Sequence, residues 1–377
     1  MSLYLLFSTI FNLFTCSLPI CLYADWIQLQ FTNNNPHNMN AHNFMMNYMY
    51  VSSNDRTENT WILDFNKFAG MNHTEFSKYN GYTPKYYPKP TKKLALTKYP
   101  DSWDWRAKGI VGPIKDQQQC GSCWAFSAIG ALESQIIKAT GQNITLSEQD
   151  MVDCVKNVES PDGSSTCCYG CSGGEMYSVY QYLEKNQGGK DDTTVQYPYT
   201  ATDQDCLSVP SDISLQLKTY GVVSQNENDM ASALYTFGPL SVGVDANMDW
   251  QLYQRGIYNP TEEQCSSSLY EQDHGVVVVG YGTDNGLDYW IIRNSWGKDW
   301  GEGGYMRLAR GSNACGVANS AIYPILKTTT ENIWTENQCL NSHPECPSEV
   351  CYTDCPCACF VASSSSPCLC SAATCSC

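Results

Sequence analysis

The sequence predicts an α+β protein whose two subdomains differ in class and enclose a cleft. Between residues 99 and 327, apolar residues first recur at helical spacing and then gather in short β-favouring runs separated by glycine-rich turns. The helical patterns cover residues 122–140, 174–183 and 229–237, and the β-favouring runs cover residues 240–244, 276–279, 289–292 and 305–308. Because the helices precede the strands, we expect each group to pack separately and to leave a ligand cleft between them.

The helix predicted over residues 122–140 has a defined beginning and end. It contains no proline, and Gly141 follows where helices commonly stop. Its apolar stripe consists of residues at helical spacing: Ala125, Ala128, Ile129, Leu132 and Ile136. Cys123 therefore lies in the first turn. There the positive end of the helix dipole and unpaired N–H groups favour the thiolate, which is the nucleophilic form of cysteine.

A cysteine nucleophile benefits from an imidazole that pairs with it and later protonates the leaving amine. His274 is the one histidine between residues 99 and 327 and lies 151 residues after Cys123. It begins a run of valines that predicts a buried strand, which would hold the ring rigidly. We therefore predict Cys123 as nucleophile and His274 as acid–base. A disulfide or packing role for Cys123, and a structural role for His274, are the alternatives.

Several motifs point in the same direction. CGSCW, at residues 120–124, is a signature of papain-like proteases. In chain order the motifs are SWDWR, QCGSCWAFS, GCSGG, DHGVVVVGYG, RNSWG, WGEGGY and CGVANSAIYP. Through them residues 101–324 resemble the papain family of cysteine proteases, close to cathepsin L. The resemblance implies a papain-like fold with a helical left subdomain, an antiparallel β-barrel-like right subdomain and an active site in the cleft. It also implies endopeptidase action through a thioester acyl-enzyme.

The resemblance assigns further roles at the catalytic centre. Asn294 corresponds to the family's side-chain amide that orients His274, and Trp296 to the indole that shields this hydrogen bond from water. Gln117 corresponds to the amide that forms the oxyanion hole together with the backbone N–H of the nucleophile. Gln118 follows where close relatives usually have glycine. A turn asparagine and an ordinary polar loop are the alternative interpretations of Asn294 and Gln117.

Seven residues are expected to line the substrate cleft, and Trp296, described above, is one of them. Gly173 and Gly174 match a pair whose backbone approaches an extended peptide, which requires the absence of a side chain. A simple turn is the alternative. By motif alignment the main specificity pocket is lined by Met176, Ala246, Gly275 and Ser320. None of these is charged, so we expect the pocket to prefer an apolar or aromatic side chain.

The chain divides into four predicted segments. Residues 1–24 carry no charged side chain and contain a long apolar run, which predicts a signal peptide, with an uncleaved signal anchor as the alternative. Residues 25–98 are polar and rich in Asn and Tyr, and end in a Pro- and Lys-containing linker. Residues 99–327 form the predicted peptidase domain. Residues 328–377 form a cysteine-rich tail.

Residues 63–76, LDFNKFAGMNHTEF, resemble the family's inhibitory propeptide. They retain Asn66, Phe68 and Phe76 but have Asp64 and Gly70 where the family has Gly and Asp. An upstream helical motif is reduced to Phe44, Asn47 and Val51. We therefore expect residues 25–98 to act as an intramolecular inhibitor.

Twenty-one cysteines and the signal-like start indicate the secretory pathway, ending in a lysosome, a vacuole or the extracellular space. The resemblance pairs Cys120 with Cys171, Cys154 with Cys206, and Cys265 with Cys315. Cys167 and Cys168 are left to join each other, to reshuffle a neighbouring pair or to stay free. The ten cysteines of the tail favour a disulfide knot over metal binding. Asn72 and Asn143 begin glycosylation sequons.

The formal net charge of −16 argues against nucleic acid as a partner. The expected partners are peptide or protein substrates, the chain's own propeptide and inhibitors of the cystatin type, and the expected state is a monomer. No metal or organic cofactor is expected. Two other function classes compete: a non-catalytic binding protein on the same fold, and an adhesion or matrix module centred on the tail.

Overall fold

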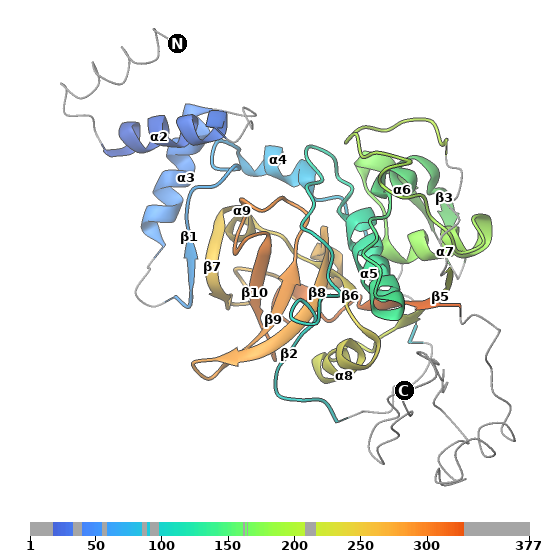
Figure 1. Cartoon of the computed structure of the whole chain (residues 1–377). Coiled ribbons are helices and arrows are strands. Elements are labelled where there is room, and N and C mark those ends of the chain that lie inside the picture. The colour runs from blue at the N-terminus through green and yellow to red at the C-terminus, as the bar shows by residue number, and fades with distance from the viewer. Residues whose placement is uncertain are drawn as a thin grey trace, which may run out of the picture. The chain divides into compact units, whose positions relative to one another are not determined.

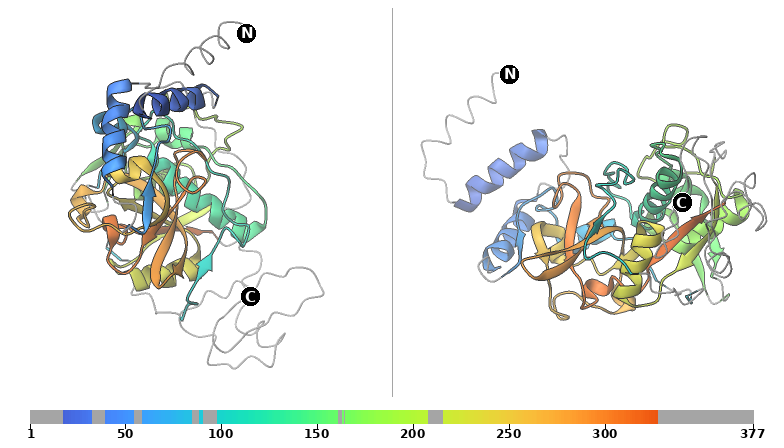
Figure 2. Two further views of the ribbon diagram at one scale, coloured as in Figure 1. Left: turned by 90° about the vertical axis from the view of Figure 1, so that its left-hand side faces the viewer. Right: turned by 60° about the horizontal axis from the view of Figure 1, so that its bottom comes forward.

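A computed structural model describes residues 18–32, 40–54, 59–84, 89–90, 98–160, 163, 165–207 and 216–327 (Figure 1). The first 17 residues of the predicted signal peptide, linker residues 85–88 and 91–97, and the predicted cysteine-rich tail lie outside the described residues. Almost all described residues belong to the first of two compact units, residues 1–325. The predicted α+β class is confirmed: one group of helices lies beside a large sheet, and other helices lie around the sheet (Figures 1 and 2).

The helical part contains α5 (Cys123–Thr140), α6 (Glu148–Cys154) and α7 (Met176–Asn186). Helix α5 begins and ends as predicted, and Gly141 at its end has a left-handed backbone, φ 70°. Helix α7 begins two residues later than predicted, because Gly174 is engaged in backbone hydrogen bonds with another segment, described below. Helix α8 (Glu227–Phe237) is capped by the Asn226 side chain, which accepts two backbone N–H groups.

The sheet has nine strands, and all four predicted runs belong to it. In chain order its strands are β1 (Trp61–Leu63), β2 (Trp103–Asp104), β5 (Leu217–Val222), β6 (Leu240–Val244), β7 (Tyr253–Tyr258), β8 (His274–Asp284), β9 (Leu287–Arg293), β10 (Tyr305–Ala309) and β11 (Ile322–Leu326). The pairs β6–β8, β8–β9 and β9–β10 are antiparallel, as expected. Strands β7 and β10 run parallel, because the chain between them passes through β8 and β9 before it reaches the neighbouring position.

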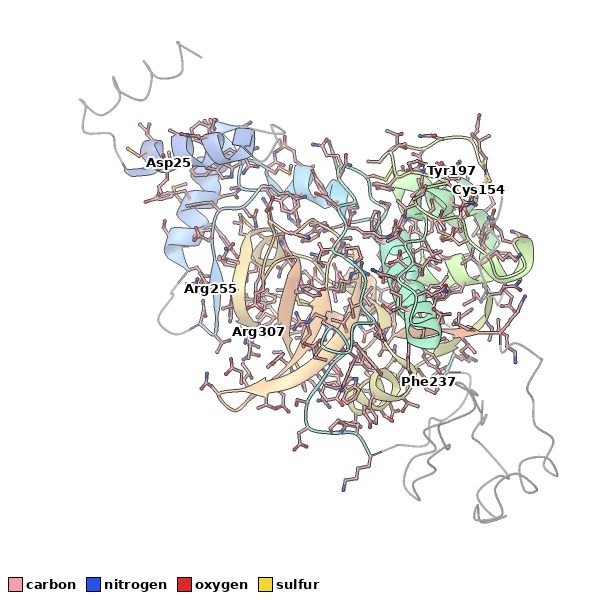
Figure 3. All side chains as sticks on the ribbon, viewed as in Figure 1. Asp25, Cys154, Tyr197, Phe237, Arg255 and Arg307 are labelled. Carbon is pink, nitrogen blue, oxygen red and sulfur yellow. A yellow bond between two sulfur atoms is a disulfide. The ribbon has the colours of Figure 1, made fainter. Side chains whose placement is uncertain are left out.

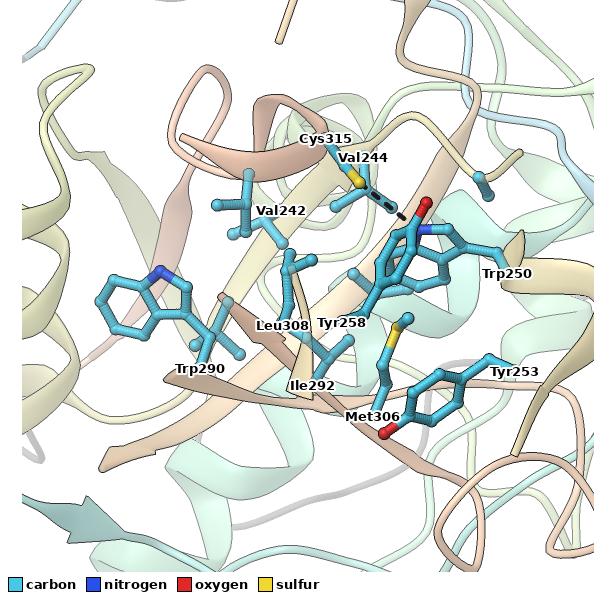
Figure 4. Packing of buried hydrophobic residues seen from close by; sticks show 14 of the residues in the cluster. Val242, Val244, Trp250, Tyr253, Tyr258, Trp290, Ile292, Met306, Leu308 and Cys315 are labelled. Atoms are coloured by element: carbon cyan, nitrogen blue, oxygen red, sulfur yellow. Dashed lines mark hydrogen bonds between the residues drawn. The ribbon is translucent and has the colours of Figure 1, made fainter. Parts of the chain in front are cut away.

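The core of the sheet side is dominated by large aromatic residues (Figure 4). Trp250 on α9 (Met248–Leu252), Tyr253 and Tyr258 are fully buried beside Met306, and the Trp250 Nε1 lies 3.5 Å from the Cys315 Sγ. Residues of this size remove much apolar surface from water, so they hold the strands that carry the site in fixed positions.

The amino-terminal segment, residues 18–84, packs against the edge of the sheet (Figures 1 and 2). It comprises α2 (Leu18–Thr32), α3 (Ala41–Ser53), β1, α4 (His73–Phe76) and the 3-10 turn η1 (Ser77–Tyr79). Strand β1 pairs antiparallel with β7. Phe44, Asn47 and Val51 form the buried face of α3. The predicted boundary at residue 24 falls inside α2.

Two short strands that the sequence analysis did not predict pair antiparallel beside the helical part. They are β3 (Lys156–Glu159) and β4 (Thr166–Tyr169), followed by the turn η2 (Gly170–Ser172). Two further short turns are η3 (Leu269–Glu271) and η4 (Ala314–Gly316). Throughout the part of the chain that the structure describes, no helix combines the length and apolar character needed to cross a membrane.

Candidate active site

Cys123 is the first residue of α5 and is fully buried. Among the described cysteines it is the one free thiol. Strand β8 lies directly against it: a Cβ placed on Gly275 would be 3.1 Å from the Cys123 carbonyl oxygen. This contact brings the start of β8, which is His274, to the amino-terminal end of α5.

His274 is held on two sides. Its Nε2 lies 2.8 Å from the Asn294 Oδ1. The Trp296 indole stacks on the imidazole, with ring centroids 4.4 Å apart and planes 26° apart. Both partners come from the segment that follows β9, and all three side chains are buried. The geometry thus fixes the ring and leaves Nδ1 as the nitrogen available for proton transfer.

Gln117 is fully buried beside the nucleophile. Its Nε2 donates to the carbonyl oxygens of Tyr79, at 2.7 Å, and Cys120, at 2.8 Å. Its Oε1 accepts from the Ser295 hydroxyl at 2.7 Å. The sequence analysis missed Ser295 and Tyr199, whose hydroxyl donates to the Gln117 carbonyl at 2.7 Å. Ser295 could have been noticed as the neighbour of Asn294 in RNSWG. Nothing in the linear sequence points to Tyr199.

Burial acts on the ionisation of both catalytic side chains. Burial raises the pKa of Cys123 to about 11, with the charge of Asp273 acting in the same direction, and backbone N–H groups oppose this only partly. Burial also lowers the pKa of His274 to about 4. Burial thus disfavours the charged form of each group in this closed arrangement, while the Gly81 N–H, at 3.2 Å from the Cys123 Sγ, acts in the opposite direction on the thiol.

Gly173 and Gly174 approach an extended peptide, and that peptide is the amino-terminal segment itself. The Gly174 N–H donates to the Gly81 carbonyl at 2.8 Å, and the Thr83 N–H donates to the Gly174 carbonyl at 3.3 Å. A Cβ on Gly173 would be 2.8 Å from the Gly81 oxygen. The absence of side chains is thus required for this pairing.

Tyr82 lies in the region of the predicted specificity pocket. A Cβ on Gly243 would be 2.3 Å from the Tyr82 ring and 2.8 Å from the Ser320 Oγ, which accepts the Gly243 N–H. The sequence analysis missed Gly243, whose neighbours come from two distant segments. The Sδ of Met176, another predicted pocket residue, would be 3.3 Å from a Cβ on Gly275.

The fourth predicted pocket residue, Ala246, is fully buried, and its carbonyl accepts from the Asn80 side chain at 3.1 Å. The same amide donates to the Asp273 carboxyl at 2.9 Å. Burial raises the pKa of Asp273 to about 7, with the charge of Asp245 adding to the shift. Gly173, Gly174 and Ala246 thus contact residues 80–83 directly, whereas Met176 and Gly275 lie against each other beside Cys123.

The propeptide-like motif packs directly on the catalytic centre. Phe68 and Phe76 are fully buried, and their ring centroids lie 5.5 Å and 5.1 Å from the Trp296 indole. Asn66 donates from Nδ2 to the Gln251 carbonyl at 2.8 Å. These three residues are the ones that the sequence analysis singled out, so the motif marks the contact between the segment and the site.

The disulfides join the three pairs implied by the resemblance: Cys120 with Cys171, Cys154 with Cys206, and Cys265 with Cys315. Cys167 is joined to Cys168, one of the options left open. Cys154 follows Asp153, whose carboxylate accepts from the Tyr197 hydroxyl at 2.9 Å in the helical part (Figure 3). Asn72 and Asn143 are both exposed. Within the described residues, no group of three His, Cys, Asp or Glu side chains is arranged to hold a metal ion.

The fold and site define a thiol hydrolase, and comparison with known proteins gives the family. Residues 99–325 match the papain family of cysteine proteases. A cathepsin L-like peptidase of Aedes aegypti is 40% identical over 288 residues, covering 72% of this chain and 81% of that protein. Digestive cysteine proteinase 1 of Homarus americanus is 39% identical over 292 residues, covering 74% and 86%.

Solved structures agree. Digestive procathepsin L 3 from the larval midgut of Tenebrio molitor superposes with a TM-score of 0.70 at 33% identity, covering 82% of this chain and 99% of that one. A recombinant stem bromelain precursor gives 0.70 at 31% identity, covering 83% and 100%. The chain therefore belongs to the papain family of cysteine proteases and is a hydrolase of proteins, with the papain-like fold that the sequence predicts. Within the family it is similar to cathepsin L-like enzymes.

Proposed function

We propose that this chain is the zymogen of a cysteine endopeptidase and that residues 25–98 are its inhibitory propeptide. The observation that carries the proposal is the path of residues 79–83. The Tyr79 carbonyl accepts from Gln117 on one side of the nucleophile, and Thr83 pairs with Gly174 on the other. A cleft that holds peptide on both sides of Cys123 suits cleavage within a chain rather than at its end.

The catalytic cycle follows from the same residues. Once the propeptide leaves, Cys123 gives its proton to His274 and its sulfur attacks the scissile carbonyl carbon, and the oxyanion is stabilised by the Gln117 amide and the Cys123 backbone N–H. His274, oriented by Asn294 under Trp296, protonates the leaving amine. Water then attacks the thioester, with His274 as base, and releases the acid and the thiol. In the unprocessed chain the Gln117 amide donates to the Tyr79 carbonyl instead. Inhibition thus engages the hydrogen-bond donor that the transition state needs.

The main specificity pocket is proposed to prefer apolar or aromatic side chains. Met176, Ala246, Gly275 and Ser320 carry no charge, and Gly243 leaves room for the ring of Tyr82. Profiling with a peptide library should therefore show Tyr, Phe, Leu or Val at the second position before the cut. A profile dominated by Arg there would contradict the proposal.

The proposed maturation places a signal peptide at residues 1–24, a peptidase domain at residues 99–327 and a cysteine-rich tail at residues 328–377. Secretion or delivery to a lysosome or vacuole is supported by the disulfides and by relatives called digestive proteinases. The exposed Asn72 and Asn143 are proposed glycosylation sites. A monomeric enzyme sensitive to cystatin-type inhibitors completes the proposal.

Hydrolysis of a fluorogenic peptide after acid activation tests the function. The wild-type chain should be active, Cys123→Ala should be inactive, and Gln117→Ala should lose on the order of a hundredfold in kcat because one oxyanion donor is removed. An inactive wild type, or an active Cys123→Ala, would overturn the assignment.

A further inference from the structure

The residue after the oxyanion donor has a backbone conformation that a side chain disfavours. Gln118 has φ 54°, in the left-handed region where glycine is the usual residue. Its N–H donates to the Asp116 Oδ1 at 2.9 Å, so the carboxylate closes a turn around Gln117. The left-handed conformation of Gln118, next to the oxyanion donor Gln117, is thus supported by the side chain of Asp116.

Asp116 also lies against the segment that carries Asn294 and Trp296. Asp116 and Trp296 form an antiparallel bridge, and the Gln117 N–H donates to the Ser295 carbonyl at 2.8 Å. Gly297 has φ 76°, and a Cβ there would be 2.9 Å from the Asp116 Oδ2. The Asp116 carboxylate therefore lies between the turn of residues 116–118 and the turn at Gly297.

The second carboxylate oxygen binds the amino-terminal segment. The Lys67 Nζ lies 2.7 Å from the Asp116 Oδ2. The Lys67 side chain is only 9% exposed, while that of Asp116 is 40% exposed. Lys67 directly precedes Phe68, which packs on Trp296. One carboxylate thus uses Oδ1 for the catalytic turn and Oδ2 for the inhibitory segment.

We propose that Asp116 is a positioning residue shared by catalysis and inhibition. It holds the left-handed turn that presents Gln117 to the oxyanion, and it is the anchor on which Lys67 docks the propeptide. When the propeptide leaves, the Oδ1 contact remains and the Oδ2 contact is released. The inference rests on the proposed function, and its tests compare variants with an active wild type, so a failure of the function itself would be seen first.

The catalytic part of the proposal is tested on protein that is expressed as the full chain and then activated by acid. Asp116→Ala should lower kcat on the order of tenfold with KM little changed, because the donor is misplaced while substrate contacts stay. Asp116→Asn should keep most of kcat, since its amide oxygen also accepts the Gln118 N–H. The double variant Asp116→Ala/Gln118→Gly should recover kcat, because glycine adopts φ 54° without support. In a Gln117→Ala background, Asp116→Ala should have no further effect.

An Asp116→Ala enzyme with wild-type kcat would overturn the catalytic half. So would an Asp116→Ala loss that Gln118→Gly leaves unchanged, because a general loss of structure would not be repaired at that position. Urea midpoints of all variants identify such a general loss, and Asp116→Asn supplies a folded variant if Asp116→Ala does not fold.

The inhibitory half is tested on the unprocessed chain at neutral pH. Lys67→Met and Asp116→Asn should each speed labelling of Cys123 by a peptide epoxide about fivefold, as expected for the loss of one partly buried ion pair. The double variant should be no faster than either single variant, since both remove the same contact. The inhibitory role of the Lys67–Asp116 contact would be overturned if both single variants were labelled at the wild-type rate. It would also be overturned if the effects of the two substitutions were additive in the double variant.

Discussion

The backbone N–H of Gly81 donates a hydrogen bond of 3.2 Å to the Sγ of Cys123. The same stretch gives its Tyr79 carbonyl to Gln117 and its Gly81 carbonyl to Gly174. The polar groups that a substrate would use are therefore satisfied by backbone of the amino-terminal segment. This accounts for a site that is assembled and yet closed.

Gly81→Ala should release this closure. A Cβ on Gly81 would be 1.8 Å from the Gly121 carbonyl oxygen, which is backbone and cannot give way. We expect the unprocessed chain to hydrolyse a fluorogenic peptide about 5- to 30-fold faster than wild type at neutral pH, since a misfit of about 1–2 kcal/mol in docking has that effect. Lys78→Ala, an exposed change in the same segment, is the control and should remain latent. Equal latency of both variants would refute the steric argument.

Phe76→Ala should loosen the segment without touching Cys123. The ring is fully buried against Trp296 and Phe68, and truncation of such a ring removes about 3–5 kcal/mol. We expect a lower Tm of the unprocessed chain and partial activity before cleavage, with Phe76→Leu intermediate. The mature enzyme, from which residue 76 has been removed, should show an unaltered kcat. Wild-type Tm and latency in Phe76→Ala would show that the aromatic contact contributes little.

The reactivity of Cys123 in the unprocessed chain should rise only at high pH. Its pKa is raised to about 11 by burial, and the thiolate is the species that reacts with iodoacetamide. The alkylation rate of Cys123, followed by peptide mass spectrometry, should thus increase throughout pH 7–10. After activation the rate should already be high and nearly constant at pH 6–8. A flat profile for the unprocessed chain would mean that the thiolate is present in the zymogen.

Stability should decrease between acid and neutral pH. Burial and the charge of Asp150 raise the pKa of Asp191 well above its ordinary value. The folded chain then holds this proton more tightly than the unfolded chain, so its contribution is full below about pH 4 and is lost as pH rises through the folded pKa. Asp273, with a pKa of about 7, acts in the same direction between about pH 4 and 7.

Asp191→Asn should therefore raise Tm at pH 8 relative to wild type and leave it nearly unchanged at pH 4. The exposed residue Asp101, changed to Asn, serves as the matched control and should shift neither value. If Asp191→Asn lowers Tm equally at both pH values, the carboxyl has a structural role that does not depend on its charge.

Local patterns were sufficient for the elements that carry the catalytic pair. The spacing of Ala125 to Ile136 and the following Gly141 predicted α5, and the valine run after His274 predicted a buried strand. Helical spacing of apolar residues and an unbroken run of valines are both local signals of burial, and β8 is buried on both faces. The motif around Asn294 likewise indicated the partner that lies 2.8 Å from His274.

Features set by distant contacts were not predictable. Gly174 follows a helical pattern but is held extended by its hydrogen bonds to Gly81 and Thr83, so α7 begins later. Gly243 and Tyr199 reach the site only because the sheet and the helical part meet there. The strands β3 and β4 show no alternation of polar and apolar residues, so the PDG turn signal at residues 161–163 alone does not identify a hairpin. The closure of Cys123 depends on Gly81, more than forty residues away.

Covalent labelling with an electrophilic peptide epoxide at mildly acidic pH tests the central claim most directly. The account predicts one label per activated molecule, located on Cys123 by mass spectrometry, little label on the unprocessed chain at neutral pH, and none on Cys123→Ala. Equal labelling of the wild type and Cys123→Ala would contradict it.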